Sequence, residues 1–483
     1  MELPVLIRGV PNLSIKRVLL VEPHNPNLVG FYETVQVEPL ALEFVAGAVS
    51  DLVEVEILDL RVDRDLEGAL RRFNPDVVGI RGGYTADVPP VLDVAARVKA
   101  FNPSIWVVVG GHHASLNPAH FFSPSVDFVV IGEGERPFRH LITVLGSNDL
   151  GKLEQVQSVW WRKDGTFVLN GRLPKEKADM DERPRPRRDL VEKYRKEYFF
   201  LYHRAPYSVE TARGCRFRCT FCSVWRFHEG AYKVESAQRT IEEIASLPGS
   251  YINFVDDLAF NNHELGLELA NGLIQSGIKK RYWAQCRSDD VVRHPEVFER
   301  LAEAGLDMVL MGLESVDQEM LKRIRKGNKI DNNIKAIEIL HSLKVKIWGA
   351  FIVDPAWDET QFKQLADFVN AYNIECPQFT ILTPLPGTVL YEEVKDQLIT
   401  HDPSYFDFLH TVLPTKLPLD QFYQQIAKLY HETGMKLGSL RELLRSGEVT
   451  MDQLRDFLKR FASLTDLSTY ARGLELRPQG STA

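Results

Sequence analysis

Short apolar runs alternate with segments of helical periodicity over the first third of the chain. Uninterrupted apolar runs bounded by glycine, proline or polar residues are typical of buried parallel strands. Helical spacing covers 40–49 and 88–101. The runs predict strands at 17–22, 53–60, 76–80, 105–109 and 127–131. This order predicts an α/β fold, with a doubly wound parallel sheet in a first domain at 1–150.

The same alternation returns later in the chain. It predicts strands at 207–212, 251–255, 282–285, 307–311, 345–351 and 379–382. Helical patterns at 264–275, 295–304, 334–343 and 358–371 separate most of them. Six strands with intervening helices indicate a partial parallel (β/α)6 barrel at 207–395, whose site lies at the carboxyl ends of the strands.

Two further segments complete the predicted organisation. Residues 151–206 form a linker with a hairpin at 156–168, because Asp164-Gly165 separates two alternating runs. The proline- and arginine-rich stretch from 174 to 188 is interpreted as a solvated connector. The region 396–483 is predicted to be helical, with a helix at 419–437 and two more within 439–464.

Composition limits the classes of function. The 483 residues carry a net charge of -8, which argues against nucleic acid as the main partner. No run approaches the roughly 18 apolar residues that a membrane helix needs, and Met1-Glu2-Leu3-Pro4 begins no signal peptide. We therefore predict a cytoplasmic protein without a transmembrane segment, with peripheral membrane contact left open.

Three of the five cysteines lie within eight residues, in the spacing Cys215-x3-Cys219-x2-Cys222. No second Cys or His pair follows at the spacing of a zinc site, and a disulfide framework favours small secreted chains. Three thiolates suit a [4Fe–4S] cluster, which normally takes four cysteines, so one iron would accept a ligand from outside the protein. Cys286 and Cys376 are interpreted as core residues.

This motif, with Phe221 before the last cysteine, resembles that of the radical S-adenosylmethionine (SAM) enzymes. The resemblance implies that the open iron binds SAM. The reduced cluster would cleave SAM to a 5′-deoxyadenosyl radical that abstracts a hydrogen atom. It also implies an external electron donor of the flavodoxin or ferredoxin type. Phe221 is expected to pack on the adenine or the cluster.

Polar side chains follow the predicted barrel strands. SAM needs acceptors for its ammonium and ribose groups and a cation near its carboxylate. Asp256 and Asp257 suit the ammonium, Arg287 the carboxylate, and Glu314 and Ser315 the ribose. Each charged residue alone is more often part of a surface salt bridge, but together these residues occupy successive strand ends and match the resemblance.

Glycines mark the strand ends of the first domain. The predicted cofactor-binding residues are Gly110, Gly111, His112, Gly132, Glu133 and Gly134. The Gly-x-Gly-x-x-Gly turn of dinucleotide-binding domains is absent after the first strand. With Glu38-Pro39-Leu40, these features resemble the cobalamin-binding radical SAM enzymes. Asp-x-His-x-x-Gly is missing, so the resemblance implies base-off cobalamin without a protein histidine on cobalt.

The combined resemblance implies a methyltransferase. One SAM would methylate cob(I)alamin, and a second would yield the radical that activates an unactivated carbon of a small-molecule or lipid substrate. The pattern, including Phe406-Asp407-Phe408-Leu409-His410, is most similar to the hopanoid C-3 methylases. Two alternatives stay open. One is an oxidative enzyme like the anaerobic magnesium-protoporphyrin ester cyclases, and the other is a non-catalytic cobalamin or iron–sulfur sensor.

Overall fold

The chain folds into two compact units. The computed structural model describes residues 15–26, 34–147, 149–173, 179–434, 441, 443–445, 447 and 449–476. The first unit comprises Met1–Asn27, Glu38–Ala178 and Glu182–Arg195, and the second comprises Leu28–Val37, Asp179–Asp181 and Lys196–Ala483. The domain limits predicted from the sequence stay predictions.

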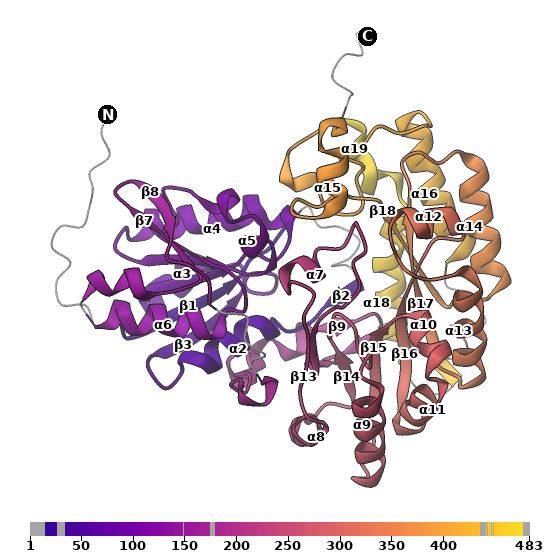
Figure 1. Cartoon of the computed structure of the whole chain (residues 1–483), viewed down its shortest axis with the longest axis horizontal. Helices are drawn as coiled ribbons and strands as arrows, with labels where there is room; N and C mark the ends of the chain where they lie inside the picture. Colours follow the sequence, from indigo (N-terminus) through magenta and orange to yellow (C-terminus); the bar gives the residue numbers. More distant parts are fainter. Residues whose placement is uncertain are drawn as a thin grey trace. The chain divides into compact units, whose positions relative to one another are not determined.

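A seven-stranded sheet forms the centre of the first unit (Figure 1). Its strands lie in the order β3-β1-β4-β5-β6-β7-β8. Its strands are β1 (Arg17–Glu22), β3 (Glu54–Asp59), β4 (Val77–Arg81), β5 (Trp106–Gly110), β6 (Phe128–Val130), β7 (Val159–Lys163) and β8 (Thr166–Leu169). The first five are parallel, and β7 and β8 are antiparallel. The predicted doubly wound sheet is confirmed.

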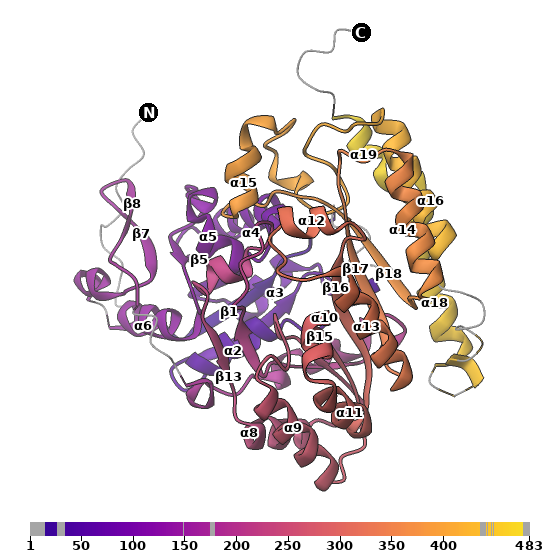
Figure 2. The same cartoon turned by 45° about the vertical axis from the view of Figure 1, so that its right-hand side comes forward.

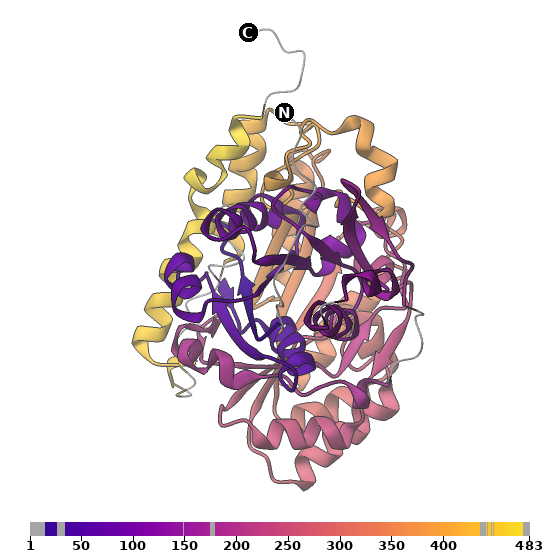
Figure 3. The same ribbon diagram turned by 90° about the vertical axis from the view of Figure 1, so that its left-hand side faces the viewer.

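Helices cover both faces of this sheet (Figure 3). They are α2 (Leu40–Val49), α3 (Leu66–Phe73), α4 (Val88–Phe101), α5 (His112–Leu116) and α6 (Glu135–Gly146). Helices α3 and α4 pack with strand residues such as Leu19 and Val107, which are fully buried. On the other face, the ring of Phe138 from α6 lies against Gly79 of β4. Burial on both faces explains why these strands are continuous apolar runs.

The segment predicted as a linker differs from its prediction. Its hairpin joins the first sheet, because Trp160 of β7 pairs with Val129 of β6. The connector at 174–188 is not solvated throughout, since Arg188 contacts Glu38 at 2.6 Å. Arg195, which lies beyond the connector, contacts the same carboxylate at 2.5 Å. Glu38 is 3% exposed, and a buried carboxylate needs such cationic partners. Local sequence does not show these pairings, because both are tertiary.

The second unit contains six parallel strands in the order β11-β14-β15-β16-β17-β18. They are β11 (Tyr207–Val209), β14 (Tyr251–Phe254), β15 (Arg281–Cys286), β16 (Leu306–Glu314), β17 (Lys346–Val353) and β18 (Cys376–Ile381). The helices that precede β14 or follow β14 to β17 in the chain are α8 (Ala237–Ser246), α9 (His263–Gln275), α10 (Ser288–Arg293), α11 (Pro295–Ala304), α12 (Gln318–Arg323), α13 (Ile330–Ser342) and α14 (Glu359–Ala371) (Figure 2). The predicted partial barrel is confirmed.

Aromatic side chains fill the barrel near the amino ends of its strands. Trp283, Trp348 and Tyr251 come from three strands and pack with Phe200 of β9 (Phe199–Phe200). Leu454 and Phe457 of α18 (Met451–Phe461) belong to the same buried cluster. The expectation that Cys286 and Cys376 are core residues is confirmed, since each is 5% exposed.

Several predicted bounds shift. The strand predicted at 207–212 ends at Val209, and β16 continues to Glu314 instead of stopping at 311. In the tail, α15 (Val389–Val394), α16 (Leu419–Thr433), α18 and α19 (Ala471–Leu474) are helical. The end of the helix predicted at 419–437 and part of the pair predicted within 439–464 lie outside the described residues. In the described part of the chain, no helix is long and apolar enough to cross a membrane.

Candidate active site

The three clustered cysteines lie in the loop of a short hairpin in the second unit. Its strands are β12 (Ala212–Gly214) and β13 (Tyr232–Val234), which pair antiparallel. Gly214 has a φ of 91°, and a Cβ there would overlap the carbonyl oxygen of Ala231. Only glycine therefore suits the residue before Cys215.

Hydrogen bonds between protein groups hold the cysteine loop in place. Trp225 of α7 (Val224–Phe227) donates its indole N–H to the Cys219 carbonyl at 2.9 Å. The Thr220 N–H donates to the Ile324 carbonyl at 2.9 Å, and the Thr220 carbonyl accepts from the Leu390 N–H at 2.9 Å. These bonds tie the loop to the segments after α12 and at the start of α15.

All three thiols are free, and Cys219 is 7% exposed. Burial raises the pKa of each of the three thiols, and that of Cys222 to about 12. Electrostatic interactions with Cys219 and Cys215 also raise the pKa of Cys222. Among the described residues, no three His, Cys, Asp or Glu side chains surround a single metal ion. Ligands of a four-iron cluster bind different irons, so three soft thiols in one loop suit that group, and coordination would deprotonate them.

Asp256 and Asp257 follow β14 and hold the base of the hairpin. Asp256 is fully buried and accepts from the Thr211 N–H and hydroxyl at 2.6 Å each and from the Ala212 N–H at 2.9 Å. Burial raises its pKa to about 7, against the effect of these hydrogen bonds. Asp257 accepts from the Gly214 N–H at 3.0 Å. Their predicted contact with SAM stays a prediction.

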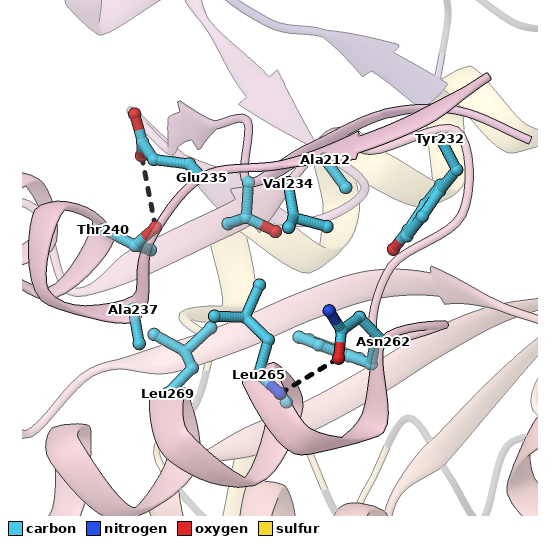
Figure 4. Close-up of a pocket in the computed structure, with 12 residues that line it drawn as sticks. Ala212, Tyr232, Val234, Glu235, Ala237, Thr240, Asn262, Leu265 and Leu269 are labelled. Carbon is cyan, nitrogen blue, oxygen red and sulfur yellow. Dashed lines mark hydrogen bonds between the residues drawn. The ribbon is translucent and has the colours of Figure 1, made fainter. Parts of the chain in front are cut away.

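A cavity lies beneath this hairpin, but it is too small for a ligand (Figure 4). It has room for about one water molecule. Glu235 accepts from the Thr240 hydroxyl at 3.2 Å, and the Asn262 side chain accepts from the Leu265 N–H at 3.3 Å. Because these lining oxygens already have partners, we interpret the cavity as a packing gap behind the site.

Arg287 begins α10 and contacts the cysteine loop directly. Its Cζ lies 3.5 Å from the centre of the Phe217 ring. Nε donates to Asp289 Oδ1 and Nη2 donates to the Lys326 carbonyl, both at 2.8 Å. With 5% exposure, Arg287 is locked between the loop and the segment after α12. Its predicted role at the SAM carboxylate stays a prediction.

Glu314 stands at a bulge at the end of β16, with a φ of 62°. Its Oε1 accepts from the ammonium of Lys326 at 2.6 Å, and both residues are buried. Ser315 accepts from the Asp317 N–H at 3.0 Å. Sequence reasoning missed Lys326, because a lysine beside Gly327 in a polar loop resembles any surface lysine.

Phe221 packs on an apolar cluster of the second unit, whose buried members are Met320, Leu321, Ile324, Ile352, Leu382 and Leu390. It is half-buried. The structure thus gives Phe221 a packing role within the protein. Its expected contact with the adenine or the cluster stays a prediction.

The predicted cobalamin-binding residues gather at the carboxyl edge of the first sheet. Gly110 ends β5 and pairs with Val130 of β6, so the turns after both strands lie at one edge. Gly111 has a φ of 132°, and a Cβ there would lie 2.8 Å from the Gly82 carbonyl oxygen. A Cβ on Gly132 would meet nothing within 4 Å. The backbone at Gly132 is therefore open to close approach by a ligand, whereas Gly111 allows the two turns to pack closely.

The two histidines at this edge differ. His113 is buried, with Nδ1 3.1 Å from the Thr85 hydroxyl and Nε2 3.1 Å from His120 Nδ1. Burial lowers its pKa to about 3, so the ring is neutral at physiological pH. His112 opens α5 and is half-buried, while Glu133 and Gly134 precede α6. Both ring nitrogens of His113 are engaged inside the protein. The expectation of a cobalamin without a protein histidine on cobalt stays a prediction.

Comparisons with known proteins decide the family. Residues 33–142 match the B12 binding domain, and residues 209–369 match the radical SAM superfamily. The hopanoid C-3 methylase of Methylococcus capsulatus is 33% identical over 402 residues, which are 81% of this chain and 76% of that protein. The chain belongs to the cobalamin-binding radical SAM enzymes. Membership confirms the predicted cofactors, namely a [4Fe–4S] cluster, SAM and cobalamin, and the prediction of an enzyme of the methyltransferase type.

The chain is also similar to a second relative and to a solved structure. The anaerobic magnesium-protoporphyrin IX monomethyl ester cyclase of Synechocystis sp. is 24% identical over 420 residues, 82% of this chain and 81% of that one. The radical SAM methyltransferase TsrM from Kitasatospora setae, solved with cobalamin and a [4Fe–4S] cluster, has the same fold, with a TM-score of 0.67 at 16% identity. The alignment covers 86% of this chain and 89% of TsrM.

Proposed function

We propose that this enzyme methylates an unactivated carbon of a polycyclic lipid, and specifically the C-3 position of a hopanoid. The observation that carries the proposal is the 33% identity to the hopanoid C-3 methylase, which extends over 76% of that protein. The cyclase of Synechocystis shares only 24%. Methyl transfer is therefore favoured over oxidative ring closure.

In this proposal, the second unit binds the cluster through Cys215, Cys219 and Cys222, and SAM near Glu314 and Ser315. When bound, the cluster with SAM supplies hydrogen abstraction and cobalamin supplies the methyl carrier. The hairpin and the Thr220 backbone bonds fix the thiols in position. The aromatic packing at the amino ends of the strands closes that end of the barrel. Water is thereby excluded from reaching the site through the amino end.

Two buried cations, Arg287 and Lys326, lie next to the cysteine loop. We propose that Lys326 takes the role at the SAM carboxylate that the sequence predicted for Arg287. The Arg287 guanidinium already serves Asp289, the Lys326 carbonyl and the Phe217 ring. We assign Arg287 mainly to positioning the cysteine loop. Within the described residues, the Lys326 ammonium pairs with the Glu314 carboxylate, and it retains N–H donors for the carboxylate of SAM.

In the first unit, we assign the turns at Gly110-Gly111-His112 and Gly132-Glu133-Gly134 to cobalamin. The open backbone at Gly132 supports this assignment. We also propose a cytoplasmic location and an external electron donor of the flavodoxin or ferredoxin type.

A labelled-methyl assay tests the function. The protein is reconstituted anaerobically with iron, sulfide and hydroxocobalamin, reduced, and given a hopanoid without a C-3 methyl group and SAM with a deuterated methyl group. We expect a hopanoid that carries the label at C-3, together with 5′-deoxyadenosine. The Cys219→Ser variant is the control and should form neither product.

Each alternative gives a different result in the same assay. A cyclase-type enzyme would form 5′-deoxyadenosine without transferring the label to any substrate. A sensor would leave SAM intact under reducing conditions. Label on an unrelated lipid or small molecule would retain the methyltransferase and overturn the hopanoid assignment.

A further inference from the structure

Three exposed arginines lie within or just after the cysteine motif. Arg216 and Arg218 lie inside it, and Arg226 follows in α7. The chain as a whole carries a net charge of -8, whereas these three side chains are all positive. Within the described part of the chain, none of the three pairs with a carboxylate, whereas the neighbouring Arg213 donates to Glu210 at 2.9 Å. We refer to Arg216, Arg218 and Arg226 as the arginine patch.

Aromatic rings hold the patch in place. The Cζ of Arg216 lies 5.1 Å from the centre of the Tyr232 ring. The Cζ atoms of Arg218 and Arg226 lie 5.4 and 5.2 Å from the centre of the same Trp225 ring. Such cation–π contacts orient guanidinium groups without neutralising their charge. The patch is thus a preformed positive surface, and Trp225 is itself bonded to the carbonyl of Cys219.

The position of the patch indicates what it recognises. Each arginine of the motif is adjacent in sequence to a cysteine that we assign to the cluster, so a partner on the patch would lie next to that cluster. Positive side chains steer acidic proteins and orient them on contact. Resting on the proposed function, the cluster needs single electrons from outside the chain.

We propose that the arginine patch docks an acidic one-electron carrier protein of the flavodoxin type. One electron leaves the reduced flavin of the carrier, and the oxidised cluster takes it up. No bond to the cluster forms or breaks in this step. The patch raises the encounter rate and places the carrier beside the cysteine loop.

The test follows reduction of the cluster, not methylation. Cluster-loaded protein is mixed anaerobically with reduced flavodoxin at low ionic strength, and loss of the cluster absorbance gives the rate. We expect Arg216→Glu with Arg218→Glu to slow this reaction at least tenfold, and Arg226→Glu alone to slow it several-fold. The wild-type rate should also fall steeply with salt, while that of the double variant should not.

Two controls separate docking from damage. Arg455→Glu reverses an exposed charge that is paired with Asp452 on α18, a helix that packs at the amino ends of the barrel strands, and should keep the wild-type rate. Reduced methyl viologen, a small cation, should reduce every variant at least as fast as the wild type. Arg226 lies outside the cysteine motif, so its variant keeps the test valid if the double variant loses iron.

Three results would overturn the proposal. They are an unchanged flavodoxin rate in all patch variants, an equal loss in Arg455→Glu, and a wild-type rate that ignores salt. The assay contains neither cobalamin nor substrate. Failure of hopanoid methylation would therefore leave the result on docking standing, and failure of docking would leave methylation with a chemical reductant intact.

Discussion

Replacing Asp256 by asparagine should remove a large pH dependence from the stability of the second unit. Asp256 is fully buried, and desolvation raises its pKa from 3.8 to about 7. The folded state therefore binds a proton that the unfolded chain releases, so stability falls as pH rises. The contribution is fully present below about pH 4 and is lost as pH passes 7. A difference of about 3 pKa units corresponds to about 4 kcal/mol.

The assay is urea unfolding of the cluster-free protein at several pH values. Between pH 5 and 7 the free energy of unfolding of the wild type should fall by about 2 kcal/mol more than that of Asp256→Asn. The reason is that each proton contributes up to about 1.4 kcal/mol per pH unit. Other titrating groups cancel in this difference. Asp452→Asn removes an exposed carboxylate on α18 and serves as the matched control. Equal pH dependence in Asp256→Asn and the wild type would refute the reasoning.

Three further predictions concern the same unit, and one concerns the first. Cys219→Ser should lower the iron content after reconstitution and abolish SAM cleavage, and an unchanged cluster spectrum would exclude Cys219 as a ligand. Gly214→Ala should destabilise the hairpin by about 1–3 kcal/mol because of its φ of 91° and the overlap with a carbonyl, as thermal unfolding would show. Lys326→Gln should lower the midpoint potential of the cluster and Glu314→Gln should raise it, because a nearby cation stabilises the more negative reduced state; shifts of the same sign in a redox titration would contradict this. Gly111→Ala should weaken cobalamin retention on gel filtration, while retention at the wild-type level would argue against a cofactor at that turn.

The sequence predicted the elements that local pattern determines. Buried parallel strands need continuous apolar runs, so hydrophobicity alone predicts the parallel strands of both sheets. The β7–β8 hairpin is predicted by its Asp-Gly turn, and the spacing of three cysteines indicates the cluster. Pairings between distant segments were not predictable. The strands of the β12–β13 hairpin are three residues each and show no periodicity. The contacts of Arg287 with Phe217 and of Lys326 with Glu314 arise only when the strand ends meet in the fold.

The bonds that hold the cysteine loop bear on what happens to the protein when oxygen destroys its cluster. Its hairpin pairing, the buried carboxylate of Asp256 and the indole bond to Cys219 all join protein to protein. In small zinc domains the metal supplies the folding free energy, and its loss unfolds the chain. Here the bonds that hold the loop involve no metal, so we expect the second unit to stay folded when the cluster is lost. A cluster destroyed by oxidation would leave a folded binding site into which a new cluster can be inserted. Oxidative loss of the cofactor would then not require degradation of the protein.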